Sequence, residues 1–174
     1  NPVVGNWDGL SYAETFQKVR AIAQYLIDLN FAEGETIVIL SENSLEHALL
    51  ALAAVHIGIP YSPITPPYSL VSNDFGKLNH CLEIMTPKVI FAQNGNVYAP
   101  ALKLAKQLFP EAKIVTVEET HEIHFAELLT AVPTESVDAA YTKVNADTIA
   151  KVLFTSGSTG LPKGVINTQR MWCA

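Results

Sequence analysis

The sequence predicts an α/β protein: a three-layer α/β/α arrangement with a mainly parallel, doubly wound sheet. Short apolar runs alternate along the chain with segments of helical periodicity, which is the pattern of strand–helix–strand units. These runs are apolar at successive positions rather than at every second one, as expected for strands buried on both faces. The chain of 174 residues has no internal repeat and is long enough for one globular domain.

The first helix and strand are predicted by local signals. Ser11 and Glu14 stand three residues apart, which is the spacing of a capping box, and apolar residues then recur at helical spacing as far as Leu26. A turn around Gly34 follows. The β-branched run at 36–40 (TIVIL) is typical of a buried strand.

The second helix and the later elements continue the alternation. Asn43 and Glu46 form another capping signal, so we expect a helix from Leu45 that ends near Gly58, where Pro60 prevents continuation. The remaining expected elements are a strand at 61–64, a turn containing Pro63, Pro66 and Pro67, a helix capped by Ser72, a strand at 89–92, a helix at about 100–109, a strand at 114–117, a short helix near 125–131, a polar connection at 132–147, a strand at 149–154 and a helix beginning near Thr168.

Composition disfavours several classes of protein. The 11 Lys and Arg residues form no run and the net charge is −6, so we do not expect nucleic-acid binding. The longest apolar run, 48–55, is far shorter than the roughly 20 residues of a membrane helix, so we expect no membrane association. Cys81 and Cys173 have the spacing of neither a disulfide framework nor a metal site, which favours a reducing, cytoplasmic location.

One segment, 155–164 (TSGSTGLPKG), has the chemistry of a phosphate-binding loop, and we call it the phosphate loop. It follows the strand at 149–154 and precedes an expected helix, and ligands of such sheets bind beyond the carboxyl ends of strands. Its glycines let backbone N–H groups approach an anion, its hydroxyls donate hydrogen bonds, and its lysine adds positive charge. The candidate binding residues are Thr155, Ser156, Gly157, Ser158, Thr159, Gly160, Lys163 and Gly164.

The phosphate loop matches neither of two common nucleotide-binding motifs. Counting from Gly157, Pro162 stands where the Walker A pattern requires its second glycine, and Gly164 stands where it requires Ser or Thr. Gly157 and Gly160 are three residues apart, so the dinucleotide pattern also fails. A flexible surface loop without function is disfavoured by the apolar strand before it and by Pro162 and Lys163 within it.

The run FTSGSTGLPKGV at 154–165 resembles the signature loop of the adenylate-forming superfamily. That superfamily includes acyl- and aryl-CoA ligases, peptide-synthetase adenylation domains and beetle luciferases. Weaker similarities in matching order extend over nearly the whole chain, at 9–14, 34–46 and 58–64. The stretches 61–70 and 167–171 look most like feruloyl-CoA synthetases.

This resemblance implies an enzyme that uses ATP and Mg²⁺ to convert a carboxylic acid into an acyl-adenylate, and then forms a thioester with coenzyme A. The implied acid is small and aromatic, such as ferulate or another hydroxycinnamate. Residues 155–164 would hold the β- and γ-phosphates, with Thr159 and Lys163 as the main contacts. The alternatives are a fatty-acyl or amino-acid adenylating enzyme of the same superfamily, or a non-catalytic nucleotide-binding module.

The resemblance also implies that part of the site lies elsewhere. The superfamily's magnesium-contacting acidic motif, ribose-binding aspartate and C-terminal lysine cannot be placed on any residue of this sequence. We therefore expect residues 1–174 to be a partial N-terminal AMP-binding domain, inactive by itself. Met171 and Trp172 belong to the last expected helix, and their exposure would favour self-association.

The histidines are interpreted as structural residues. His121 and His124 lack further convergent ligands for a metal. His80 and Cys81 are adjacent on an expected helix and point about 100° apart, so they would not form a nucleophile–base pair. Two interpretations remain open for Tyr61, Tyr68 and the prolines between them, which would either border the substrate site or form only a rigid turn.

Overall fold

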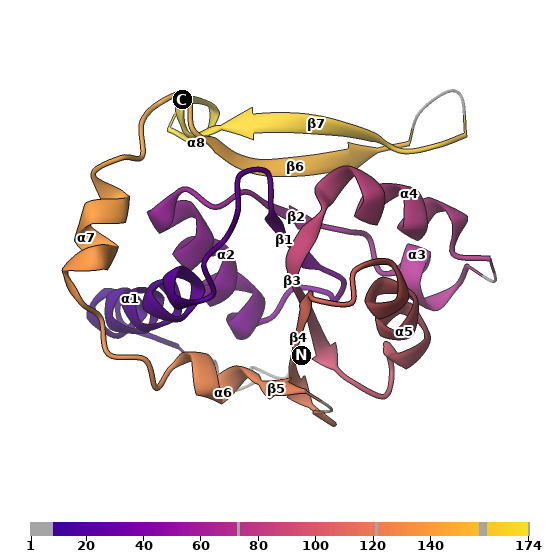
Figure 1. Ribbon diagram of the computed structural model, residues 1–174, viewed down its shortest axis with the longest axis horizontal. Helices are drawn as coiled ribbons and strands as arrows, with labels where there is room; N and C mark the ends of the chain where they lie inside the picture. The colour runs from indigo at the N-terminus through magenta and orange to yellow at the C-terminus, as the bar shows by residue number, and fades with distance from the viewer. Residues whose placement is uncertain (1–8, 73, 121, 157–159, 174) are drawn as a thin grey trace, which may run out of the picture.

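The computed structural model describes residues 9–72, 74–120, 122–156 and 160–173 and confirms the predicted α/β class. Among these residues, seven strands form one sheet in the order β5-β4-β3-β1-β2-β6-β7, with helices on both faces (Figure 1). All neighbouring strands are parallel except the antiparallel pair β6 and β7. The strands are β1 (Thr36–Ile39), β2 (Tyr61–Pro63), β3 (Pro87–Asn94), β4 (Lys113–Glu118), β5 (Ile123–His124), β6 (Ile149–Thr155) and β7 (Lys163–Thr168).

Apart from α8 (Gln169–Trp172), which contacts β7 at the edge of the sheet, the helices form the two outer layers. They are α1 (Tyr12–Asp28), α2 (Leu45–Ile57), α3 (Pro67–Leu70), α4 (Gly76–Met85), α5 (Ala99–Leu108), α6 (Phe125–Leu128) and α7 (Glu135–Tyr141). Figure 1 shows α1, α2, α6 and α7 on one side of the sheet and α3, α4 and α5 on the other. No helix among the described residues has the length and apolar character needed to cross a membrane.

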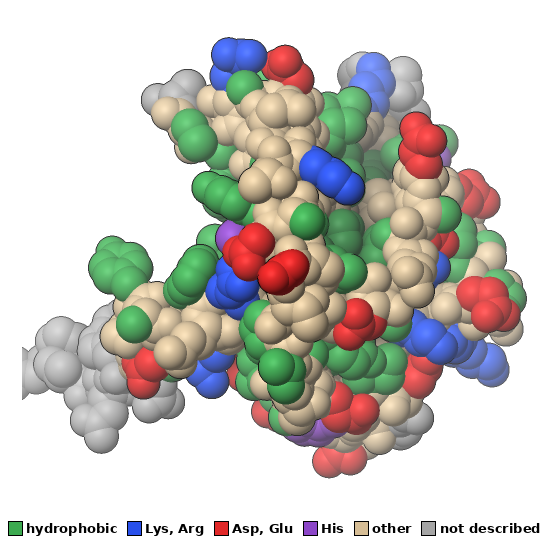
Figure 2. All heavy atoms as spheres, turned by 60° about the vertical axis from the view of Figure 1, so that its left-hand side comes forward, with side chains coloured by type: hydrophobic (Ala, Val, Ile, Leu, Met, Phe, Trp, Pro, Cys, Tyr) green, Lys and Arg blue, Asp and Glu red, His purple; other side chains and the backbone are tan. Residues whose placement is uncertain are grey.

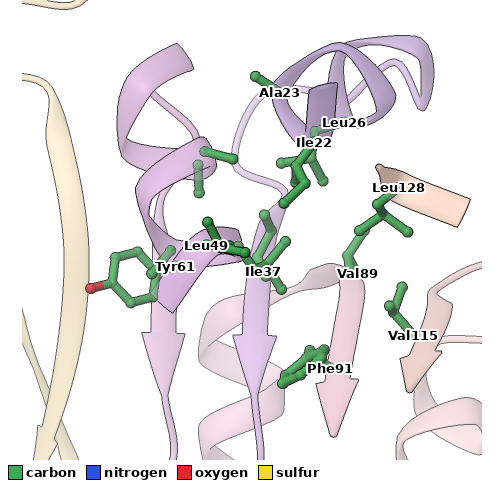
Figure 3. Close-up of a cluster of buried hydrophobic side chains, with 14 of the residues drawn as sticks. Ile22, Ala23, Leu26, Ile37, Leu49, Tyr61, Val89, Phe91, Val115 and Leu128 are labelled. Carbon is green, nitrogen blue, oxygen red and sulfur yellow. The ribbon is translucent and has the colours of Figure 1, made fainter. Parts of the chain in front are cut away.

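The alternation of side chains along the strands builds two cores. Ile37 and Ile39 of β1 belong to the cluster that includes α1 and α2 residues, whereas Val38 and Leu40 belong to the cluster with α4 and α5 residues. Figure 3 shows the first cluster, in which α1 and α2 pack over the central strands. Because both faces of β1 are covered, all four of its residues are buried.

The predicted helix ends are partly confirmed. Ser11 and Glu14 form the expected capping box, with the Ser11 hydroxyl accepting a hydrogen bond from the Glu14 backbone N–H at 3.2 Å. Gly58 ends α2 in the left-handed conformation, with φ of 76°, as its position after the last apolar residue indicates.

Two predicted caps are wrong. The cap of α2 is Ser44, not Asn43, because the Ser44 hydroxyl accepts the hydrogen bond from the His47 N–H at 3.0 Å. Ser72 does not cap α4, since its hydroxyl instead donates to Asp74 Oδ1 at 2.9 Å. The sequence alone does not distinguish a polar side chain that caps a helix from one whose hydrogen bond is already made within a turn.

Helix α3 lies where only a proline-containing turn was expected, and three further elements were not predicted. Helix α7 lies inside the expected polar connection and buries Val137 against the rest of the protein. Strand β5 has only two residues. The third correction concerns the phosphate loop, which is followed first by strand β7 and only then by the expected helix, α8, with Thr168 at its N-cap position. The β-branched residues of β7 favour a strand, and pairing with β6 completes it.

The surface carries mixed charges. Figure 2 shows Lys and Arg side chains scattered among Asp and Glu on the face that comes forward when the side bearing α1 and α7 is turned toward the viewer. No basic stripe is seen on that face. This agrees with a net charge of −6 and with the absence of basic runs in the sequence.

Candidate phosphate-binding site

The phosphate loop joins β6 to β7 and lies at the carboxyl edge of the parallel strands. Strand β6 runs parallel to β2, with Tyr61 opposite Lys151, so Thr155 lies at the edge where ligands of open α/β sheets bind. The antiparallel pairing then places Lys163 directly opposite Thr155. Of the candidate residues, Thr155, Ser156, Gly160, Lys163 and Gly164 are described, whereas Gly157, Ser158 and Thr159 lie outside the described residues.

Strand β6 is fastened to the parallel sheet by a side chain. Pro63 follows Ser62 in β2 and has no N–H with which to continue the ladder. The fully buried Ser62 hydroxyl instead donates a hydrogen bond to the Val152 carbonyl oxygen at 2.7 Å. This bond sets the position of β6 three residues before its exposed last residue, Thr155.

Lys163 is available to an anion. Its side chain is exposed and, within the described ranges, forms no ion pair. Its backbone is held instead, by pairing with Thr155, whose hydroxyl donates weakly to the Lys163 carbonyl oxygen at 3.5 Å. A fixed backbone and a free ammonium group suit a residue that reaches for a phosphate.

Two glycines of the phosphate loop serve different purposes. Gly160 has a φ of +90°, a conformation that side chains rarely adopt. A Cβ at Gly164 would lie 2.9 Å from Val152 Cγ1, so the Val152 side chain of β6 already occupies that space. Gly160 is therefore required for a turn, and Gly164 for the close packing of β7 against β6.

A hollow of about 720 Å³ lies beside Thr155, and we call it the edge hollow. Its walls come from the residues at and after the carboxyl ends of β1, β2 and β6, including Asn43, Thr65 and Phe154. Ser41 also lines it, and the Ser41 Oγ atom is buried with no hydrogen-bond partner in the described part of the chain. Buried hydroxyls are normally paired, so this one is available to a bound molecule or to water.

The two tyrosines near the proline-rich turn have different surroundings. Tyr61 is buried in the core cluster, and burial raises its hydroxyl pKa. Tyr68 lines a second hollow, of about 430 Å³, together with Gly160 and Leu161 of the phosphate loop. Lys77 Nζ lies 5.5 Å from the centre of the Tyr68 ring in the same hollow. Of the two tyrosines, Tyr68 alone lies beside the phosphate loop, and Pro63, Pro66 and Pro67 line the edge hollow.

His80 contacts the phosphate loop, which the sequence did not indicate. The His80 Nε2 atom lies 3.0 Å from the Pro162 carbonyl oxygen, across 82 residues of sequence. The neighbouring Cys81 is buried, and burial raises its thiol pKa to about 12, so it is not a nucleophile at neutral pH. The two residues do not form a catalytic pair.

The remaining described histidines have structural contacts. His124 caps α6, with its Nδ1 accepting from the Ala126 N–H at 3.1 Å, and His121 lies outside the described residues. His56 stacks on Tyr141 with ring centres 4.8 Å apart, and burial lowers the pKa of its imidazole. Across the described residues, no three His, Cys, Asp or Glu side chains come together as metal ligands.

The fold and the edge site define an α/β protein with a glycine- and hydroxyl-rich loop at the carboxyl edge of its sheet. The family model described as AMP-binding enzyme matches residues 2–174, and the chain belongs to this family.

The similar proteins are members of several adenylate-forming groups. The chain is 30% identical over 165 residues to a 4-coumarate–CoA ligase-like protein of Arabidopsis thaliana and 29% identical over 165 residues to indigoidine synthase of Streptomyces lavendulae. Both matches span 94% of this chain but only 27% and 12% of the lengths of the two relatives. The crystal structure of ATP-bound MatB from Rhodopseudomonas palustris superposes with a TM-score of 0.71 over 92% of this chain and 30% of that one, at 24% identity, which supports the shared fold.

Proposed function

We propose that this chain holds the β- and γ-phosphates of ATP on the phosphate loop of an acid–CoA ligase. The observation that carries the proposal is the position of that loop: Ser62 fastens β6, and Lys163 is exposed across from Thr155, beside the edge hollow. In the first half-reaction, the substrate carboxylate attacks the α-phosphorus and pyrophosphate leaves with the electron pair. In the second, the thiol of coenzyme A displaces AMP and forms the thioester.

The chemistry of the phosphate loop suits the first half-reaction. Negative charge grows on the leaving pyrophosphate, and donors already in place around it lower the barrier. Lys163, the hydroxyls of Thr155 and Ser156, and the backbone N–H groups of the loop supply such donors. Magnesium would arrive with the phosphates, since Mg²⁺ is usually held by substrate phosphates and one or two carboxylates rather than by a complete protein cage. The hydroxyl oxygens of Thr155 and Ser156 suit Mg²⁺, which prefers oxygen ligands.

The proposed acid is a hydroxycinnamate such as ferulate. This narrower proposal is supported by the resemblance of 61–70 to feruloyl-CoA synthetases and by the 4-coumarate–CoA ligase-like relative. An amino acid is the second candidate, because the chain is also 28% identical over 169 residues to a nonribosomal peptide synthetase of Aspergillus fumigatus.

We further propose that residues 1–174 supply only part of the active site. The chain spans 27% of the length of the ligase-like relative, and no described residue is assigned to the ribose or to coenzyme A. Thioester formation by residues 1–174 alone would overturn this part of the proposal.

ATP–pyrophosphate exchange tests the proposed function. The protein is expressed from its full natural reading frame. The rate of exchange is then compared among ferulate, benzoate, a medium-chain fatty acid and several amino acids. Ferulate-dependent exchange, followed by thioester formation only when coenzyme A is added, is the expected result. Exchange with another acid would keep the adenylation reaction and replace the substrate. Exchange with none of them would refute adenylation.

A further inference from the structure

We infer that His80 is a positioning residue for the phosphate loop, and that it acts by holding the peptide group immediately before Lys163. The inference deepens the proposed function and rests on it. It begins from the one described hydrogen bond that joins a helix side chain to the phosphate loop, between His80 Nε2 and the Pro162 carbonyl oxygen at 3.0 Å. A carbonyl only accepts, so Nε2 carries the proton and donates.

The helix that carries the His80 donor is packed into the core. Helix α4 carries Leu78, Cys81, Leu82 and Met85 into the second core, and each of these side chains is buried. His80 lies on the partly buried flank of the same helix, and Figure 1 shows α4 beneath the end of the hairpin where the phosphate loop lies. The position of the imidazole is therefore set by core packing rather than by the loop itself.

The acceptor is the part of the loop that is itself held. Pro162 is buried, whereas its neighbours Leu161 and Lys163 are exposed. Gly160 and Leu161 also line the hollow beside α3 and α4, so the segment 160–162, which leads into β7, lies along these helices. The hydrogen bond from His80 thus holds this segment at Pro162, its buried residue.

The consequence concerns Lys163. Its preceding peptide group is held by His80 through the Pro162 carbonyl, and its own carbonyl faces the Thr155 hydroxyl on β6. The two contacts fix the backbone of Lys163 from both sides while its side chain stays exposed. Loss of the His80 donor would let the backbone of Lys163 shift, which would weaken phosphate binding without altering the acid site.

Substitutions that separate the donor from the ring test this inference. His80→Phe keeps a ring and removes the donor, His80→Leu removes both, and His80→Gln places an amide N–H close to the position of Nε2. Glu83→Gln is the matched control, because Glu83 is exposed on the same helix. Steady-state ATP–pyrophosphate exchange gives the KM for ATP and the KM for the acid separately, and melting temperatures identify variants that fail to fold.

Removal of the donor is expected to raise the KM for ATP about fivefold to tenfold, the scale of one net hydrogen bond, with the KM for the acid within about twofold of wild type. His80→Gln and Glu83→Gln are expected to resemble wild type. Equal KM values for ATP in His80→Gln and the donor-less variants would overturn the inference, whether both are raised or both unchanged.

A second readout separates this inference from the proposed function. If the wild-type protein shows no exchange with any acid, the proposed function fails, and calorimetric binding of ATP decides the role of His80. His80→Leu must then bind ATP about fivefold to tenfold more weakly than His80→Gln, and equal affinities would contradict the inference.

Discussion

The central parallel sheet and the β6–β7 hairpin differ in what holds them. All four residues of β1 are buried, and its two faces contribute to two cores. In β7, by contrast, the first four residues are exposed. The hairpin is held at separate points: by Ser62 on Val152, by His80 on Pro162, and by Gln169 Nε2, which donates to the Val55 carbonyl at 3.1 Å. Packing on both faces stabilises the central strands, whereas the hairpin combines these polar contacts with the packing of Val152 and Phe154 of β6 against the second core.

The largest expected effect on stability separates these two regions. Phe91 of β3 is fully buried and contacts Phe125 with ring centres 5.8 Å apart, so Phe91→Ala should lower the free energy of unfolding by about 3–5 kcal/mol. Ile166→Ala on the exposed face of β7 should change it by less than about 0.5 kcal/mol. Urea unfolding measures both. Equal losses would show that the hairpin is as tightly packed as the sheet.

An intermediate effect is expected where the hairpin does have a packing constraint. In Gly164→Ala, the new Cβ would meet Val152 Cγ1 at 2.9 Å, and such overpacking typically costs about 1–3 kcal/mol. Gly9→Ala is the control, because nothing lies within 4 Å of a Cβ at that position. Hydrogen exchange of the β6 and β7 amides should accelerate in the first variant only. Unchanged exchange in Gly164→Ala would mean that Val152 moves aside at little cost.

The smallest expected effect lies at the surface of the α1, α2, α6 and α7 layer. Arg20 Nη2 donates to Asp138 Oδ2 at 2.9 Å, which joins α1 to α7, and this hydrogen bond lowers the pKa of Asp138 below its ordinary 3.8. A depressed folded-state pKa gives stability that is present above the unfolded-state value and is lost as pH falls through the folded-state value.

Thermal unfolding of Asp138→Asn against wild type therefore tests this pair. The stability difference should be full near neutral pH, should shrink on acidification below about pH 4, and should also shrink in high salt because both groups reach solvent. A difference that does not change with pH would mean that the side chain acts through packing and not through its charge.

Local signals made most of the sheet predictable from sequence, and they are also the basis for proposing the phosphate loop. The capping box at Ser11, the left-handed Gly58 and the apolar strand runs each lie within a few residues, and the structure confirms them. The phosphate loop is likewise one uninterrupted run, so its chemistry could be stated before its position was known.

The remaining features depend on contacts between distant residues. Strands β5 and β7 exist because β4 and β6 pair with them. The cap of α2 depended on which of two adjacent polar side chains reached the His47 N–H. His80 could not be assigned to the site because 82 residues separate it from Pro162, and nothing in its local sequence distinguishes it from a packed helix residue.

Substitution of the two lysines of the hairpin tests the central claim most directly. Lys163 is exposed opposite Thr155, whereas Lys151 Nζ lies 4.9 Å from the centre of the Trp172 ring at the other end of the hairpin. ATP–pyrophosphate exchange should fall by about 10²–10³-fold in Lys163→Ala, the scale for loss of one preorganised donor, and should stay close to wild type in Lys151→Ala. An unchanged exchange rate in Lys163→Ala would contradict the assignment of ATP phosphates to this loop.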